Sequence, residues 1–211
     1  MAYSRGTSAN IIVGAAALFT FESGELADTD LPAYEAGLSF RETLSDEVGF
    51  RNVGYTMNGL EIQFQPDFGE VQVDQILDVA KLYKQGMQVN LNTAFAESTL
   101  ENLLFAIAGQ DSDLDAGVTD PDLRVLTLRA GDIGECPVER GLIAVGPGTG
   151  DCDPAEQIER IYTAYRALSI ENVTVSAKRD EPTMFEVSFR LLPNDSGTYG
   201  KIVDRTIPAT S

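Results

Sequence analysis

The sequence predicts an all-β fold with one flanking α-helix, built as a single domain over residues 1–211. The main observation is an alternation of apolar and polar residues, typical of half-buried strands, in residues 60–65, 87–95 and 185–191. Turn-forming glycine, proline and asparagine residues separate many of these segments. A hydrophobic share of 43% is enough for a chain of this length to bury a sizeable core.

The N-terminal part contains one predicted strand and one long connection. Residues 10–21 predict a buried strand, because the apolar run is too short to span a bilayer and no convincing signal-peptide cleavage site follows it. We therefore expect synthesis in the cytoplasm and no contact with a membrane. Residues 22–58 have little periodicity, and connections of this length tend to be functional. We predict a long inter-subunit loop here, with these apolar contact residues: Phe40, Leu44, Val48 and Phe50.

Two strands and a short helix are predicted between residues 60 and 95. Residues 60–65 form an alternating strand that ends at Pro66, and residues 70–73 repeat the pattern after a turn. Asp74 is a candidate cap for a short helix that would carry Ile76, Leu77, Ala80 and Tyr83 and would end at Gly86. Residues 87–95 then alternate cleanly and predict the clearest strand of this half.

The flanking helix is predicted immediately after this strand. Ser98 and Glu101 have the spacing of a capping box, in which each side chain accepts a hydrogen bond from a free backbone N–H of the first turn. An apolar stripe at helical spacing follows, and Gly109 is suited to end the helix. The stripe consists of Leu100, Leu103, Leu104 and Ile107.

Strands also dominate the predicted C-terminal half. Residues 123–128 and 141–145 are candidate strands, and residues 173–177 and 185–191 predict a hairpin. The pattern of residues 153–168 fits a helix and a strand nearly equally. The segment from Pro193 to Ser211 loses its pattern after Val203, so we expect residues 193–211 to form a C-terminal arm that reaches outward.

Composition restricts the classes of function. Acidic residues outnumber basic ones by 33 to 15, which gives a formal net charge of −18 and makes long-range binding to nucleic acid repulsive. The chain has no histidine, which removes Ser-His-Asp and Cys-His catalytic arrangements and all histidine-ligated metal sites. We therefore predict a protein that is not an enzyme and has no cofactor.

The two cysteines, Cys136 and Cys152, flank an apolar strand candidate. Their spacing would suit a disulfide across a hairpin, but spacing alone does not establish one. Two free thiols are the alternative, and a reducing cytoplasm favours it.

One acidic segment, residues 111–122, resembles a calcium-binding loop. Its oxygens match the ligand spacing of an EF-hand at Asp111, Asp113, Asp115, Thr119 and Asp122. It departs from that motif at Ala116, where glycine is needed for the sharp turn, and it lacks a helix after the loop. A solvated acidic loop without metal is the favoured interpretation.

Four further carboxylates lie near two predicted strands: Glu61, Asp67, Glu70 and Asp74. Two of them could pair for acid–base chemistry, as in glycosidases. Alternation itself places them on the exposed face of a sheet, which is the favoured interpretation.

Several segments, taken in order, resemble the tube-forming major tail proteins of long-tailed bacteriophages. The similarity is densest in residues 50–56, 58–62 and 97–103, and it returns in residues 189–193 and 199–204. The resemblance implies a β-sandwich or barrel of the phage tail tube type, and it favours a strand for residues 153–168. It also implies six copies to a ring, with rings stacked into a hollow conduit for DNA delivery around the tape-measure protein.

The resemblance also implies partners and a location. The partners would be the protein itself, the tape-measure protein, and the tail terminator and tail-tip proteins, while DNA would pass through without specific binding. The protein would be made in the host bacterial cytoplasm and would reside in the virion tail. Two alternatives stay open: a calcium-dependent binding or adhesion module, and a ring protein of a contractile secretion system.

Overall fold

The computed structural model describes residues 10–75, 78–115, 122–131, 133–134, 136–150, 156–176, 179–180 and 182–208. Strands account for 46% of the chain and helices for 12%, which confirms the all-β class. The structure has two α-helices where one was predicted: α1 (Phe40–Asp46) and α2 (Leu100–Ala106). Two short 3₁₀ turns, η2 (Asp28–Asp30) and η3 (Asp111–Asp113), complete the helical segments in this part of the chain.

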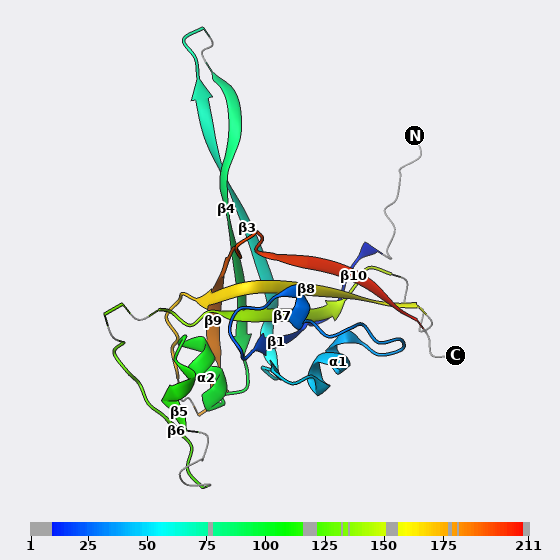
Figure 1. Ribbon diagram of the computed structural model, residues 1–211, viewed down its shortest axis with the longest axis vertical. Helices are drawn as coiled ribbons and strands as arrows, with labels where there is room; N and C mark the ends of the chain where they lie inside the picture. The colour runs from blue at the N-terminus through cyan, green and yellow to red at the C-terminus, as the bar shows by residue number, and fades with distance from the viewer. Residues whose placement is uncertain are drawn as a thin grey trace.

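One antiparallel sheet of eight strands organises the molecule (Figure 1). The strands run in the order β2-β1-β7-β8-β9-β4-β3, and β10 pairs separately with β8. Their bounds are β1 (Ala17–Phe21), β2 (Phe50–Asn52), β3 (Thr56–Gln72), β4 (Val79–Phe95), β7 (Arg140–Pro147), β8 (Glu156–Ser169), β9 (Phe185–Leu192) and β10 (Gly200–Pro208). A second, two-stranded sheet consists of β5 (Leu114–Asp115) and β6 (Val125–Leu126).

The long strand β8 divides the sheet into two branches. Along one edge, residues 156–164 pair with β10 and residues 166–169 pair with β9, while β7 pairs along the other edge. The β9-β4-β3 branch therefore leaves the sheet at a steep angle to β7 and β8 (Figure 1). Because of this branching, β9 and β4 lie against one face of β1, β7 and β8 and enclose a core with them.

Two apolar clusters lie on opposite faces of β1, β7 and β8. The first cluster joins these strands to β4, β9 and α2, and in it Phe105 of α2 stacks on Phe189 of β9 at 4.7 Å between ring centroids. The second cluster lies under α1 and includes Phe19, Phe40 and Ile143. Consecutive residues of β7 alternate between the clusters, so Leu142 to Val145 are all buried. The unbroken apolar run in the sequence thus reflects a strand covered on both faces.

The predicted strand over residues 153–168 is confirmed by β8 from residue 156 onward, and residues 153–155 lie outside the described residues. The predicted flanking helix is confirmed by α2 with a shifted start. Thr99, rather than Ser98, caps α2, because its side chain accepts from the backbone N–H of Asn102 at 3.2 Å. Ser98 instead donates its hydroxyl to the carbonyl of Thr183 at 2.5 Å. The β-strand candidate at residues 123–128 is reduced to the two residues of β6.

Two predicted elements are wrong. The short helix after Asp74 does not form, because Ala80 and Tyr83 belong to the extended strand β4. The hairpin between residues 173–177 and 185–191 is also wrong, because β9 pairs with β4 and β8 while residues 173–176 are irregular. Alternating apolar residues identified β9 as a strand, but they did not identify its partners, which are β4 and β8.

The segment 22–58 is more ordered than the sequence predicts. It contains η2, α1 and β2, and α1 begins with a capping box in which Ser39 and Glu42 satisfy each other's backbone N–H groups. The Ser-x-x-Glu spacing was the signal in the sequence that identifies this helix. The C-terminal arm is likewise corrected, because β10 pairs along β8 from Gly200 to Pro208 instead of reaching outward.

Candidate functional site

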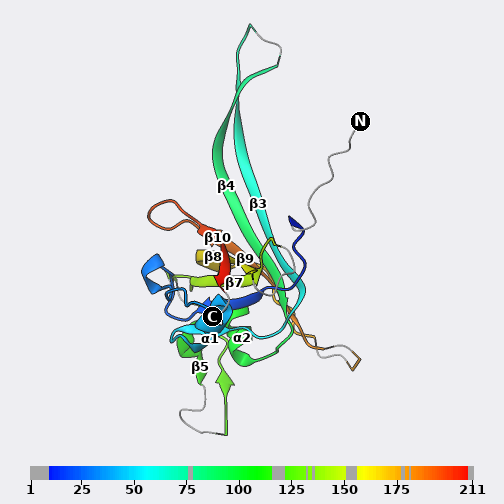
Figure 2. The same cartoon turned by 90° about the vertical axis from the view of Figure 1, so that its right-hand side faces the viewer.

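The most prominent surface is a ribbon formed by β3 and β4. It extends away from the body on the side opposite α1 and α2 (Figures 1 and 2). β4 pairs with β9 only through Val89–Phe95, whereas its first ten residues pair with β3. We call residues 66–75 and 78–88 the distal ribbon. An isolated two-stranded ribbon is marginally stable in water, so the distal ribbon is a candidate contact surface.

Large apolar side chains lie on the distal ribbon in contact with solvent. Five of them are each at least 39% exposed: Phe68, Val71, Val73, Leu82 and Tyr83. Exposed apolar groups gathered in one place commonly mark an interaction surface, whereas single ones do not. The distal ribbon is therefore a candidate assembly surface.

A cross-strand pair of glycine and tyrosine stiffens the distal ribbon. Gly69 and Tyr83 are register partners, and a Cβ on Gly69 would lie 2.5 Å from Cζ of the Tyr83 ring. The amide of Gln85 donates to the Tyr83 hydroxyl at 3.1 Å. An aromatic ring over a glycine restores contact area that the glycine lacks and fixes the register of the two strands.

Two long strands present open edges, whereas the third edge strand, β2, has only three residues. β3 is the last strand of the sheet and β10 pairs only with β8, as far as the described residues show. Unpaired N–H and C=O groups along such edges are a template for pairing with another chain. Both edges are long, with 17 residues in β3 and 9 in β10.

An apolar groove separates the base of the ribbon from β10. Its volume is about 590 Å³. Its walls include Phe64 and Met87 of the ribbon base, Tyr162 of β8, and Tyr199 and Ile202 at β10. Two lysines, Lys84 and Lys201, also line it, and no carboxylate is among the described residues that do so. The chain has a net charge of −18, so a groove lined by two basic side chains and by no acidic one among the described residues is unusual.

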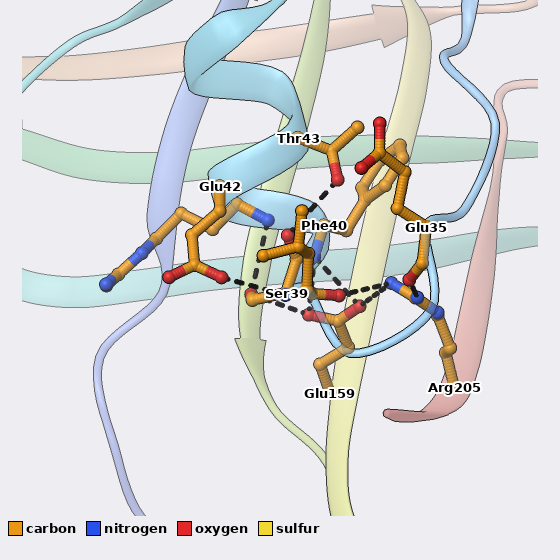
Figure 3. A network of polar contacts seen from close by, with 9 residues as sticks. Glu35, Ser39, Phe40, Glu42, Thr43, Glu159 and Arg205 are labelled. Atoms are coloured by element: carbon orange, nitrogen blue, oxygen red, sulfur yellow. Dashed lines mark hydrogen bonds and ion pairs between the residues drawn. The ribbon is translucent and has the colours of Figure 1, made fainter. Parts of the chain in front are cut away.

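The buried carboxylate of Glu159 holds the α1 segment against the sheet (Figure 3). It accepts from the hydroxyl of Ser39 at 2.9 Å and from the backbone N–H of Phe40 at 3.0 Å. Arg205 of β10 donates to the same carboxylate at 2.8 Å and also to the carbonyl oxygens of Leu38 and Glu35. This network joins residues 35–40 to β8 and β10.

Asp28 makes a second connection between the segment 22–58 and the sheet. It accepts from the hydroxyl of Tyr165 at 2.9 Å and from Nζ of Lys201 at 2.6 Å. The hydrogen bond from Lys201, followed by that from Tyr165, lowers the pKa of Asp28 below its ordinary value. Burial, together with the hydrogen bond to Asp28, raises the pKa of Tyr165.

Asn102 in α2 makes the third connection. Its buried amide donates to the carbonyls of Val53 and Glu97, and its oxygen accepts from Arg51 at 2.7 Å. Burial lowers the pKa of Arg51, which also forms an ion pair with Glu22 at 3.4 Å. Residues 51–53 are thereby held against α2.

These contacts bear on the four predicted inter-subunit residues. Phe40 and Leu44 are buried within the chain, so they do not present a surface to a partner. Phe50 is half-buried and its ring lies 5.0 Å from that of Phe21. Val48 is 92% exposed. The contact of this segment with a second subunit stays a prediction, and only Val48 is fully available for it.

The acidic loop places its first carboxylates against arginines. Asp111 forms an ion pair with Arg140, and Asp113 forms one with Arg129 at 2.7 Å. Thr119 lies outside the described residues. No group of three or more potential metal-ligating side chains gathers in the described part of the chain. The structure therefore gives Asp111 and Asp113 an arginine partner each.

The other candidate groups are dispersed. Glu61, Asp67 and Glu70 lie exposed along β3, and Asp74 lies exposed beyond its end, in a ribbon where apolar residues such as Phe68 are exposed as well. Cys136 is exposed and forms no disulfide within the described residues. Cys152 lies outside the described residues, so a disulfide between the two stays untested.

No protein-family model matches the chain, and no curated protein matches it. Within the described residues, no helix combines the length and the apolar character needed to cross a membrane. The resemblance to phage tail tube proteins thus stays an expectation from the sequence segments that carry it.

Proposed function

We propose that this protein is a structural, non-enzymatic subunit that self-assembles into a bacteriophage tail tube. In this proposal, hexameric rings stack into a hollow conduit that surrounds the tape-measure protein and later passes DNA. The tail terminator and tail-tip proteins would bind the ends of the tube, and the protein would reside in the virion tail.

The distal ribbon is the observation that carries the proposal. A protein that acts alone gains nothing from two strands extended into solvent with apolar side chains exposed. A subunit in an assembly gains a long, stiff element that reaches a neighbouring copy. The ribbon therefore supports self-association more strongly than it supports a binding pocket for a small molecule.

The open edges of β3 and β10 support closure into rings. These edges differ in length and in sequence, so pairing one with the other in a neighbouring copy is a head-to-tail contact. Head-to-tail contacts generate rings when the rotation between copies closes. Joined edges would also bury the unpaired backbone groups that make an isolated edge prone to aggregation.

The charge of the chain supports a conduit for DNA. A net charge of −18 repels phosphate groups, so a wall built from this protein would let a duplex pass without adhesion. The chain also lacks histidine, the side chain most often used for proton transfer near neutral pH.

Electron microscopy of the concentrated, purified protein tests the proposal, together with sedimentation velocity over a range of concentrations. We expect rings or hollow tubes with six-fold symmetry that persist in the presence of a chelator. A protein that stays monomeric at all concentrations would contradict self-assembly. Assemblies that appear only with calcium would instead favour a calcium-dependent module.

A further inference from the structure

We propose that the apolar groove between the ribbon base and β10 receives the ribbon tip of a second copy of this chain. The inference rests on the proposed self-assembly and names the contact that would join successive copies. The ribbon tip is defined here as residues 70–75, 78 and 79, and the groove is the cavity described above.

The chemistry of the groove is apolar and basic. Phe64, Met87 and Ile202 contribute apolar surface, and Tyr162 and Tyr199 contribute aromatic rings. Lys84 has no acidic partner among the described residues, and the side chain of Lys201 is 33% exposed beside Asp28. An occupant that fits this groove is apolar and carries negative charge.

The ribbon tip has the complementary chemistry. Its eight residues carry three acidic side chains (Glu70, Asp74 and Asp78), three aliphatic side chains and no basic one. Glu70 and Asp74 form no ion pair within the described part of the chain. Val71 and Val73 are 40% and 39% exposed, which leaves them available for burial in a partner. Charge and apolar character therefore match between tip and groove.

The tip does not reach the groove of its own chain. Gly86, at the groove, is the register partner of Asp67, and Gln75, near the tip, lies eight positions after Asp67 along the ribbon. At about 3.3 Å per residue, the tip lies roughly 26 Å along the ribbon from its own groove. The Gly69–Tyr83 pair stiffens the ribbon between them. A second copy, displaced along the ribbon axis, brings the two surfaces together.

Residues 1–9 are a less suitable occupant. They carry Arg5 and no acidic residue, so their charge has the same sign as that of Lys84 and Lys201. The contact between tip and groove involves two different surfaces, and it is therefore heterologous and propagates from copy to copy.

Disulfide trapping between two full-length proteins of distinguishable mass tests the inference. Both carry Cys136→Ser and Cys152→Ser, one also carries Val73→Cys at the tip, and the other carries Ile202→Cys in the groove. Because docking raises the effective concentration of the two thiols, we expect heterodimer yield about tenfold or more above a control pair. The control replaces Val73→Cys with Val175→Cys, an exposed valine outside both the ribbon and the groove.

Charge reversal adds a second, matched test. Lys84→Glu in the groove protein lowers the heterodimer yield severalfold, and Asp74→Lys in the tip protein restores it, because opposite charges again face each other. If the wild-type protein assembles but the tip–groove pair cross-links no better than the control, the groove assignment is wrong and self-assembly stands. If the wild-type protein neither assembles nor cross-links, the proposed function fails as well.

Discussion

At the scale of single residues, buried polar side chains determine how the connecting segments lie on the sheet. Glu159 is almost fully buried and satisfies its charge with Arg205, Ser39 and the backbone N–H of Phe40. Removing one member of a buried ion pair leaves the other charge without a partner in a medium of low dielectric constant. The position of α1 therefore depends on a residue about 120 positions away in the sequence.

Glu159→Gln destabilises the protein more than an equivalent change at the surface. We expect a loss of about 3 kcal/mol in the free energy of unfolding, because Arg205 is left buried and unpaired. The matched control is Asp204→Asn, which removes the more exposed Arg160–Asp204 pair between the same two strands and costs at most about 1 kcal/mol. Urea unfolding of both variants gives the comparison, and equal losses would contradict it.

Asp28 gives stability a dependence on acid pH. Its pKa is lowered in the folded state, so its contribution is present above the ordinary carboxyl pKa and is lost as pH falls through the lower, folded value. Asp28→Asn therefore destabilises the protein at pH 6 and loses this effect in strong acid. Thermal unfolding of both proteins across this range measures the difference. A constant difference at all pH values would show that Asp28 acts without its charge.

Calcium leaves the thermal stability nearly unchanged. Asp111 and Asp113 already pair with Arg140 and Arg129, so a cation would have to displace these arginines. We expect the melting temperature to shift by less than about 1 °C between millimolar calcium and chelator. A ligand stabilises the folded protein only when its concentration exceeds its dissociation constant. A rise of several degrees would revive the calcium-dependent module.

At the scale of secondary-structure elements, the division of β8 between β9 and β10 shapes the molecule. It sends β4 and β3 away from the rest of the sheet, and the distal ribbon continues beyond the last strand that supports it. The two apolar clusters include no residue of the distal ribbon beyond the partly buried Met87. The free energy of unfolding of the body of the fold therefore depends little on the distal ribbon.

Shortening the ribbon separates folding from assembly. Replacing residues 66–87 with an Asn-Gly turn joins the strands at Gln65 and Gln88, which are register partners. We expect circular dichroism and a melting transition close to those of the wild type, because both cores are retained. Sedimentation velocity should show that assembly is lost. Assembly at the wild-type level would place the subunit contacts elsewhere.

At the scale of the whole molecule, like charge opposes the association that the ribbon and edges favour. Six copies would carry 6 × −18 = −108 formal charges. Short-range contacts overcome this repulsion only after copies approach closely, and salt screens charges separated by more than about 10 Å at 0.1 M ionic strength. Assembly is consequently a balance between apolar burial and screened repulsion.

Salt promotes assembly under this balance. We expect the concentration needed for assembly to fall as sodium chloride rises from about 0.02 to 0.5 M, because repulsion between whole chains outweighs the few pairs at a tip–groove contact. Light scattering at several protein concentrations measures the effect. A required concentration that rises with salt would show that specific ion pairs dominate the contact.

Local pattern was enough to identify several elements. The alternation in β4 and β9, the apolar stripe of α2 and the unbroken apolar run of β7 are visible in the sequence, because each depends only on which side of one strand or helix meets the core. Composition likewise determined the strong negative charge and the absence of histidine.

The tertiary structure alone decided which strands pair and which surfaces remain open. β4 pairs with β9 across almost a hundred residues, and the groove combines residues of β3, β4, β8 and β10. Periodicity reports the face that a strand buries but not the identity of its neighbour, since pairing depends on contacts between distant segments. The apolar spacing after Asp74 suggested a helix because the sequence pattern does not show that this segment pairs with β3. The folded chain instead forms the ribbon on which the proposed assembly depends.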